Sequence, residues 1–223
     1  MEALYGGAAG GGKSEALLMA ALKHVHVPGY SALILRRRFT DLALPGAIMD
    51  RSHSWLQGTA ARWDGREKRW TFPSGANITF GYLDHEADKY RYQSAEFQFI
   101  GFDELTQFPP EWYAYLFTRL RRKATIPVVP HMRGATNPGG IGHEWVKERF
   151  LDVPEDRSFI PATFLDNPYI DHESYAKAID RADPVTARQM RGEWIQNSGG
   201  LVYLYDRDKS FLSGLPAVHP GDD

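Results

Sequence analysis

Short apolar runs alternate along the chain with longer stretches that contain no helix breaker. The short runs are bounded by turn residues, which is typical of buried strands, whereas the longer stretches are typical of helices. Strands that alternate with helices predict an α/β fold with a mostly parallel central sheet flanked by helices. The expected strands are Ala3–Tyr5, Ser31–Leu35, Phe97–Phe102, Ile126–Val129 and Ser158–Ala162, and the expected helices are Glu15–Val27, Pro110–Leu120, Glu173–Arg181 and Pro184–Trp194.

Three segments depart from this alternation. Between residues 62 and 83, turn signals separate the short β-rich runs Arg69–Phe72 and Asn77–Tyr82, which predicts an antiparallel excursion at one edge of the sheet. The prolines around Ile126–Val129 argue against a central position for that strand. Asn197–Gly200 interrupts the last helical stretch, so we expect a hinge or linker there.

Composition removes several kinds of chemistry. The chain has no cysteine, which excludes disulfides, thiolate metal sites and cysteine nucleophiles and fits a reducing compartment. The longest apolar run, Ala16–Leu22, is too short to span a bilayer, and no basic stretch followed by an apolar core opens the chain. With 43% hydrophobic and 24% charged residues, the sequence is that of an ordinary globular protein.

The net charge of −2 hides an asymmetry along the chain. Residues 1–149 carry a net charge of +4 and residues 150–223 carry −6. Anionic partners are therefore expected to meet the first two-thirds of the chain. Acidic solvated helices would explain the remaining third equally well.

A phosphate-binding loop is expected between the first strand and the first helix. Its pattern is G-x-x-x-x-G-K-[ST], in which glycines let backbone N–H groups turn toward phosphates at a helix N-terminus. The lysine would bridge phosphate oxygens, and the serine hydroxyl would hold Mg²⁺. The residues are Gly7, Ala8, Ala9, Gly10, Gly11, Gly12, Lys13 and Ser14.

Two carboxylates follow the apolar run Phe97–Phe102. The carboxyl end of a buried parallel strand would bring them beside the phosphate-binding loop. Asp103 would hold the Mg²⁺ shell through water, and Glu104 would orient and deprotonate an attacking water. A second carboxylate suits hydrolysis by water.

A polar loop and several arginines complete the candidate chemistry. Thr136, Asn137 and Pro138 form a loop in which a hydroxyl and an amide could sense the γ-phosphate, although a polar turn capped by proline explains them too. Because no arginine stands within the phosphate loop, one is expected from elsewhere, including a neighbouring subunit. Arg91 is one candidate, and Arg119, Arg121 and Arg122 are others; these arginines and Arg36–Arg38 could also contact DNA phosphates.

Four blocks in this order resemble the ATPase half of the large terminase subunit of tailed bacteriophages, which packages DNA into the capsid. The similarity runs from about Tyr5 to about Trp194. The blocks are Tyr5–Ser14, Ile34–Arg37, Phe99–Thr106 and Gly134–Pro138.

The resemblance implies a P-loop NTPase fold of the additional-strand, RecA-like class, with Glu104 on a strand next to the phosphate-loop strand. It implies ATP and Mg²⁺ as ligands, with the roles given above for Lys13, Ser14, Asp103 and Glu104 and a coupling role for Thr136–Pro138. It favours Arg91 as an arginine that acts across a subunit interface. The implied partners are double-stranded DNA, the portal protein, the small terminase subunit and further copies of the chain in a ring, in the host bacterial cytoplasm and without a membrane.

The resemblance also sets the expected domain boundaries. Residues 1–196 are expected to form the ATPase domain and residues 197–223 a linker and tail. Only four residues precede Tyr5, so the adenine-binding segment usual in the family is expected to be missing, and no nuclease activity is expected. A helicase-like P-loop ATPase and a truncated, non-catalytic binding fragment remain as alternatives.

Overall fold

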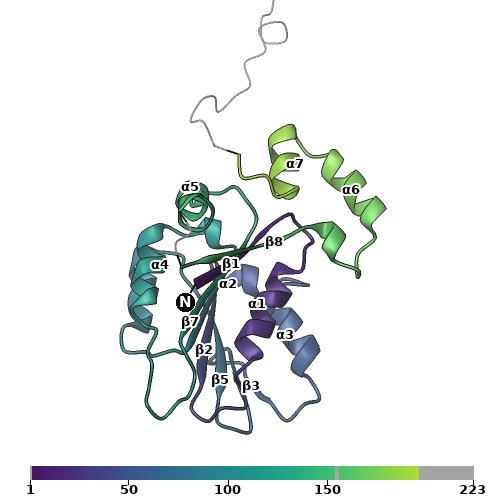
Figure 1. The fold of residues 1–223 in the computed structure, drawn as a ribbon. Helices are drawn as coiled ribbons and strands as arrows, with labels where there is room; N and C mark the ends of the chain where they lie inside the picture. Colours follow the sequence, from purple (N-terminus) through teal and green to yellow (C-terminus); the bar gives the residue numbers. More distant parts are fainter. Residues whose placement is uncertain (1, 154–155, 196–223) are drawn as a thin grey trace, which may run out of the picture.

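One sheet of eight strands, in the order β3-β4-β5-β2-β6-β7-β1-β8, forms the centre of the computed structural model, which describes residues 2–153 and 156–195 (Figure 1). All neighbouring strands are parallel except the β3–β4 and β4–β5 pairs, which confirms the expected antiparallel excursion at one edge. The strands are β1 (Glu2–Gly7), β2 (Ser31–Arg36), β3 (Arg62–Asp64), β4 (Arg69–Thr71), β5 (Asn77–Tyr82), β6 (Phe99–Asp103), β7 (His131–Thr136) and β8 (Ser158–Ala162).

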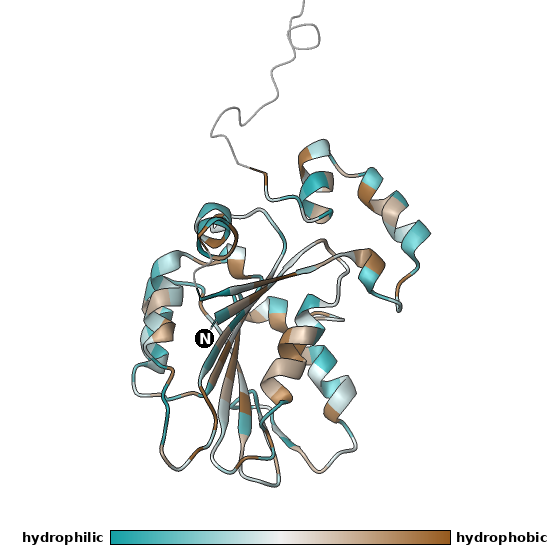
Figure 2. Cartoon of the chain, viewed as in Figure 1, coloured by the Kyte–Doolittle hydropathy of each residue, from teal (hydrophilic) through white to brown (hydrophobic). Residues whose placement is uncertain are grey.

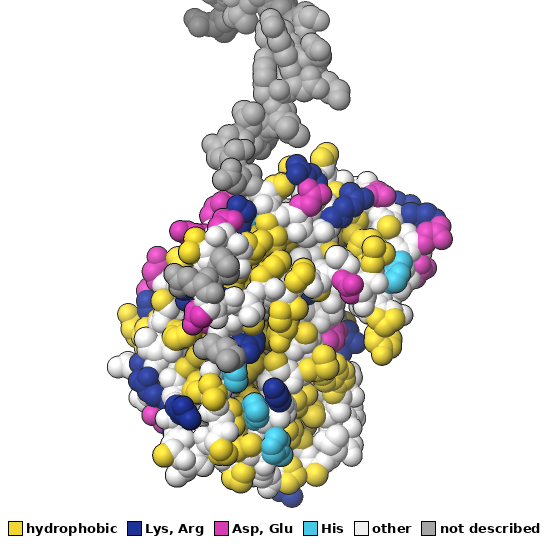
Figure 3. Space-filling view, viewed as in Figure 1, with side chains coloured by type: hydrophobic (Ala, Val, Ile, Leu, Met, Phe, Trp, Pro, Cys, Tyr) yellow, Lys and Arg dark blue, Asp and Glu magenta, His cyan; other side chains and the backbone are white. Residues whose placement is uncertain are grey.

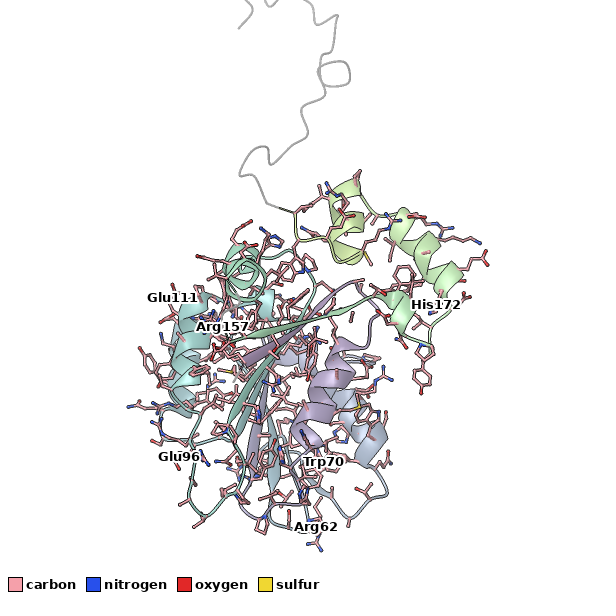
Figure 4. All side chains as sticks on the ribbon, viewed as in Figure 1. Arg62, Trp70, Glu96, Glu111, Arg157 and His172 are labelled. Atoms are coloured by element: carbon pink, nitrogen blue, oxygen red, sulfur yellow. The ribbon has the colours of Figure 1, made fainter. Side chains whose placement is uncertain are left out.

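Helices cover both faces of this sheet, with α1 and α3 on one side and α4 and α5 on the other (Figure 1). Glu111 of α4 and His172 of α6, which are labelled in Figure 4, lie on opposite sides of the molecule. The α-helices are α1 (Lys13–Leu22), α2 (Phe39–Leu42), α3 (Ile48–Leu56), α4 (Pro110–Phe117), α5 (His143–Lys147), α6 (His172–Asp180) and α7 (Pro184–Met190). Short 3₁₀ turns are η1 (Glu86–Tyr92), η2 (Leu105–Gln107) and η4 (Phe164–Asp166), and η3 (Glu148–Asp152) is a π-helical turn. None of the helices in the described part of the chain is long and apolar enough to cross a membrane.

The hydrophobic core lies on both faces of the central strands. On β2, Ala32 and Ile34 pack with α1 and α3, whereas the alternating residues Leu33 and Leu35 pack with α4. A strand buried on both faces carries a continuous apolar run, which is why this segment was recognisable from sequence. Hydrophobic residues are concentrated along these strands and α1 (Figure 2).

The expected strand at Ile126–Val129 was wrong, because the strand in this region is β7, which begins at His131. The prolines at positions 127 and 130 remove backbone donors there, and β7 follows them in a central position between β6 and β1. Thr136 consequently lies on this strand instead of in a loop. A Cβ at Gly134 would lie 2.7 Å from Leu105 Cδ2 and 2.9 Å from Leu4 Cδ1, so a larger residue there would displace these buried leucines.

Two further expectations require correction. Strand β7 separates β6 from β1, so Glu104 does not follow a strand adjacent to the phosphate-loop strand.

Three helices are also shorter than expected: α1 ends at Leu22, α4 at Phe117 and α7 at Met190. After α1, tight turns form in which Val25 N–H donates to Leu22 O and Val27 N–H donates to His24 O. The expected linker at 197–200 lies outside the described residues.

Helices α6 and α7 lie beyond the edge strand β8 and return to the end of β1 (Figure 1). The carbonyl of Met190, at the end of α7, accepts a 2.8 Å hydrogen bond from Ala9 N–H. Gly192 packs so closely that an added Cβ would lie 2.6 Å from Ala8 N. The last described helix is therefore docked on the loop that follows β1.

Candidate nucleotide-binding site

The loop from Gly7 to Gly12 joins β1 to α1 at the carboxyl edge of the sheet. Gly7 and Gly12 have φ values of 125° and 72°, which side chains disfavour. A Cβ at Gly7 would also lie 2.5 Å from Ala162 O on the neighbouring strand. Glycine is therefore required for the loop to turn beside β8 and direct the N-terminus of α1 into a cavity.

That cavity has a volume of about 280 Å³. It brings together the loop and Lys13, Ser14, Glu104 and Asn137, which the sequence predicted as site residues. It also brings in four residues that were not predicted there, Glu15, Arg51, Asn167 and Ile170.

Lys13 is buried, with 8% of its surface exposed, and its Nζ donates to Ala8 O within the loop. Burial lowers the pKa of its ammonium group, while the nearby carboxylates of Glu104 and Asp103 oppose that shift. Lys13 and the loop residues from Ala9 to Gly12 thus line one small cavity beside the N-terminus of α1, an arrangement suited to phosphate.

Ser14 and Asp103 lie far apart in the sequence and meet in the structure. Ser14 Oγ donates a 2.8 Å hydrogen bond to Asp103 Oδ1. Asp103 is 1% exposed, and burial raises the pKa of its carboxyl group, against the opposing effects of Arg36, Ser14 and Lys13. Buried carboxylates need such partners to remain charged.

Arg36 is the functional-site residue that the sequence reasoning assigned elsewhere, as a DNA contact. Its Nη1 lies 2.9 Å from Asp103 Oδ2, and its Nη2 lies 3.9 Å from Glu104 Oε1. The first contact is an ion pair whose alignment falls short of a hydrogen bond. Because β2 and β6 are parallel neighbours, both strands end at the same edge of the sheet, which brings Arg36 beside Asp103. The sequence alone does not show that these two strands are neighbours.

Glu104 directly follows β6 with a left-handed backbone, at φ 59° and ψ 54°. Burial raises the pKa of its carboxyl group and the neighbouring Asp103 raises it further, while Arg36, Lys13 and a hydrogen bond from Asn137 N–H lower it. Such strain and charge crowding in a non-glycine residue are typical of functional sites.

The donor set fits Mg²⁺. A hard cation of this kind prefers oxygen ligands and usually retains several waters. Ser14 Oγ and the two oxygens of Asp103 supply such donors, and Asp103 Oδ2 accepts no well-aligned hydrogen bond. Within the described ranges, no three His, Cys, Asp or Glu side chains form a metal cluster, so water and phosphate oxygens would complete the shell.

The expected coupling residues are divided between two environments. Asn137 lines the cavity, but Thr136 is fully buried, and its hydroxyl lies 2.8 Å from the hydroxyl of Thr106. Beyond Pro138, Gly139 N–H donates to His143 Nδ1 over 2.8 Å. Asn137 therefore belongs to the candidate site, whereas the Thr136 hydroxyl links strand β7 to the turn η2 through Thr106.

The other candidate arginines do not line the cavity. Arg91 pairs with Asp88 at 2.7 Å, stacks over Tyr82 and is 47% exposed on its side chain. Arg37 donates to the backbone carbonyls of Leu83 and Asp84, and its guanidinium lies over Trp112. These contacts stabilise the packing of the segment that follows β5.

A loop of this form, joined to α1, with one strand inserted between β1 and the strand that ends in Asp103, defines a P-loop NTPase of the additional-strand, RecA-like class. Residues 4–203 match the family described as terminase large subunit, T4likevirus-type, N-terminal. The chain therefore belongs to that family. The helicase-like alternative receives no support from this match.

Solved structures of large terminases share the fold. The large terminase of a thermophilic bacteriophage matches with a TM-score of 0.70 at 15% identity, covering 87% of this chain and 48% of that one. The large terminase ATPase domain of Thermus phage P74-26 matches with a TM-score of 0.56 at 17% identity, covering 87% and 88%. The N-terminal domain of the DNA packaging ATPase from bacteriophage phi29 matches with a TM-score of 0.51 at 16% identity, covering 75% and 92%.

The chain spans about half the length of the first of these proteins, the large terminase of the thermophilic bacteriophage. No curated protein sequence gives a significant match.

Proposed function

We propose that this domain hydrolyses ATP with Mg²⁺ and that the hydrolysis drives double-stranded DNA into a phage capsid. One observation carries the proposal: Lys13, Ser14 and Glu104 surround one cavity, and Asp103 is hydrogen-bonded to Ser14 at its edge. The large terminase of the thermophilic bacteriophage, which shares this fold, has been solved with ADP and with ATP-gamma-S, so a protein of this fold binds adenine nucleotides.

The residues have distinct roles in this proposal. Loop N–H groups and Lys13 bind the phosphates, and Glu104, when ionised, accepts a proton from the water that attacks the γ-phosphorus. The bond from that phosphorus to the bridging oxygen breaks, which releases ADP and phosphate. Ser14 and Asp103 would hold Mg²⁺, which would supply charge stabilisation. Arg36 favours the ionised form of both carboxylates, because its guanidinium lies beside them and opposes the effect of burial on their pKa values.

Arg91 is proposed to act on a neighbouring subunit. Its guanidinium is half exposed and does not line the phosphate cavity of its own chain. A ring of subunits would bring it to the next nucleotide, where an inserted arginine typically accelerates hydrolysis by about 10³–10⁵-fold. Mixing Arg91→Ala with Glu104→Gln protein should restore part of the turnover, because each variant keeps what the other lacks.

The proposed partners are the portal protein, the small terminase subunit and DNA, in the cytoplasm of the bacterial host. Family membership supports this assignment. Coupling would pass through Asn137, whose N–H contacts Glu104 and whose loop continues to His143.

The test is the ATPase rate of the purified chain, alone and with portal assemblies and DNA. We expect weak turnover alone and faster turnover with both partners. Lys13→Ala and Glu104→Gln should each reduce it by at least about 10³-fold, as loss of a phosphate-binding cation or a general base does. Glu67→Gln, on the exposed β3–β4 turn, serves as the matched control. Turnover that survives both site substitutions would refute the assignment.

A further inference from the structure

A second cavity opens directly beside the phosphate site. Its volume is about 600 Å³, roughly twice that of the phosphate cavity. It lies between α1, α3 and the segment 166–170 that leads to α6, and a notch is visible on this side of the molecule with hydrophobic side chains on both of its flanks (Figure 3). The two cavities share six lining residues, Gly11, Gly12, Glu15, Arg51, Asn167 and Ile170.

The direction of the proposed triphosphate identifies what would enter this second cavity. Its terminal phosphate must lie toward Asp103 and Glu104, where the attacking water would be activated. The other end then leaves the loop past Gly12 and Glu15, which border the second cavity. A nucleoside attached to that end has this space open to it.

The walls of the second cavity are unusually rich in exposed apolar side chains. Met19 of α1 is 57% exposed, Trp55 of α3 is 37% exposed, and Tyr169 of the opposite segment is 94% exposed. Large apolar groups that surround a cavity mark a ligand site more often than scattered ones do. Aromatic faces bind any nucleobase by stacking, because every base has a π-face.

Most polar side chains around this cavity already have partners within the protein. Asn167 Nδ2 donates to Gly10 O at 2.7 Å, and Asn167 Oδ1 accepts from Tyr169 N–H at 3.1 Å. Asp166 accepts from both the N–H and the hydroxyl of Thr163. Arg51 pairs with Glu15 at 3.1 Å and lies where the two cavities join, near the expected sugar and first phosphate. Few groups remain that could read the edge of a base.

We propose that the nucleoside of the bound nucleotide occupies this second cavity, with its base stacked between Trp55 and Tyr169. The base is held by its faces, so the domain accepts purine nucleoside triphosphates in general and binds ATP and GTP with similar affinity. This inference rests on the proposed nucleotide-binding function of the loop.

Binding is measured by calorimetry on the full chain with Mg²⁺ and three probes: ATPγS, GTPγS and inorganic tripolyphosphate, which lacks a nucleoside. For the wild-type chain we expect dissociation constants for ATPγS and GTPγS within about threefold of each other. Trp55→Ala and Tyr169→Ala should each weaken both nucleotides by about tenfold, the usual loss for one stacked base, and leave tripolyphosphate binding unchanged. Trp55→Phe should retain most of the affinity because it keeps an aromatic face.

Tyr90→Ala is the matched control, since Tyr90 is also an exposed tyrosine but packs against Tyr115 and lines neither cavity. Nucleotide affinity unchanged by Trp55→Ala and Tyr169→Ala, with tripolyphosphate still bound, would overturn the inference and leave the phosphate-site function intact. Equal weakening of tripolyphosphate would also overturn it, as would a preference of about 30-fold for ATPγS over GTPγS. Failure of all three probes to bind would refute the proposed function itself, and the nucleoside site with it.

Discussion

Glu104 is held in a backbone conformation and a charge state that are both unfavourable. Its left-handed backbone costs on the order of 1 kcal/mol for a residue with a side chain. Burial and the adjacent Asp103 raise the pKa of its carboxyl group, so the ionised form is disfavoured in the folded protein. The residue proposed as the general base is therefore a source of instability.

We expect Glu104→Gln to stabilise the nucleotide-free protein at neutral pH. A carboxyl group whose pKa is raised by folding contributes stability below its unfolded pKa and loses it as pH rises through the folded pKa. Near pH 7 the ionised Glu104 thus costs stability that a neutral glutamine avoids, and the melting temperature should rise by about 2–4 °C. The gain should shrink as the pH falls toward the raised pKa.

Thermal unfolding of both forms across this pH range, without Mg²⁺ or nucleotide, checks the expectation. Glu67→Gln, on the exposed turn, should leave the melting temperature unchanged. A Glu104→Gln variant less stable than the wild type at neutral pH would show that the Arg36 ion pair outweighs burial.

Individual site residues could be predicted from the sequence where neighbouring residues form a recognisable local pattern. The loop and Asp103–Glu104 were recognised because each has a local pattern, and the structure brings them together. Arg36, Arg51 and Asn167 were missed in this role because each reaches the cavity from a different segment. Their spacing in the chain carries no sign of that convergence.

At the scale of elements, a buried strand could be predicted from the sequence when its apolar run is continuous. Strands β2 and β6 have such runs, and both were expected. Strand β7 was missed because its residues His131, Arg133 and Gly134 interrupt the apolar pattern, although it lies at the centre of the sheet. The close approach of Leu105 and Leu4 to Gly134 is a packing constraint from distant segments, and no local sequence pattern reveals it.

The docking of α7 on the phosphate loop is a contact between elements that sequence patterns do not reveal. We expect Gly192→Ala to disrupt it, because the added Cβ would lie 2.6 Å from Ala8 N, in a residue with φ 87°. The end of α7 must then withdraw, and the hydrogen bond from Ala9 N–H to Met190 O is lost. Affinity for ATPγS, measured by calorimetry, should fall by about tenfold, the effect of one lost positioning interaction.

Gly75→Ala separates the contact from backbone strain. Gly75 has a similar φ of 83°, but a Cβ there would meet nothing within 4 Å. This variant should be destabilised by about 1 kcal/mol and bind nucleotide normally. Equal nucleotide affinities in the two variants would mean that α7 does not shape the loop.

At the scale of the whole molecule, an ionic cluster around the buried Glu2 carboxylate joins strand β1 to α4 and η3. Glu2 of β1 accepts hydrogen bonds from Tyr113 of α4 at 2.7 Å and from Arg149 of η3 at 2.8 and 2.9 Å. Arg157 lies 3.5 Å from the same carboxylate. Tyr113 and Arg149 are more than 100 residues away from Glu2 in the chain, so the cluster forms only when β1 has packed against α4 and η3.

We expect this cluster to determine how the fold responds to acid. Burial by itself would raise the pKa of Glu2, but the hydrogen bonds from Arg149 and Tyr113 and the charges of Arg149 and Arg157 together outweigh burial and lower it. A lowered pKa means that the stabilisation is present above the unfolded value of 4.5 and is lost as pH falls through the folded value. Glu2→Gln should therefore lower the unfolding free energy at pH 7 by about 2 kcal/mol, and the difference from the wild type should disappear under acid conditions.

Chemical denaturation at a series of pH values measures this difference in unfolding free energy. Glu173→Gln is the control, because the exposed Glu173–Lys177 pair should contribute nothing measurable. A pH-independent difference would show that Glu2 acts through packing and hydrogen bonding alone, and that its charge does not hold the layers together.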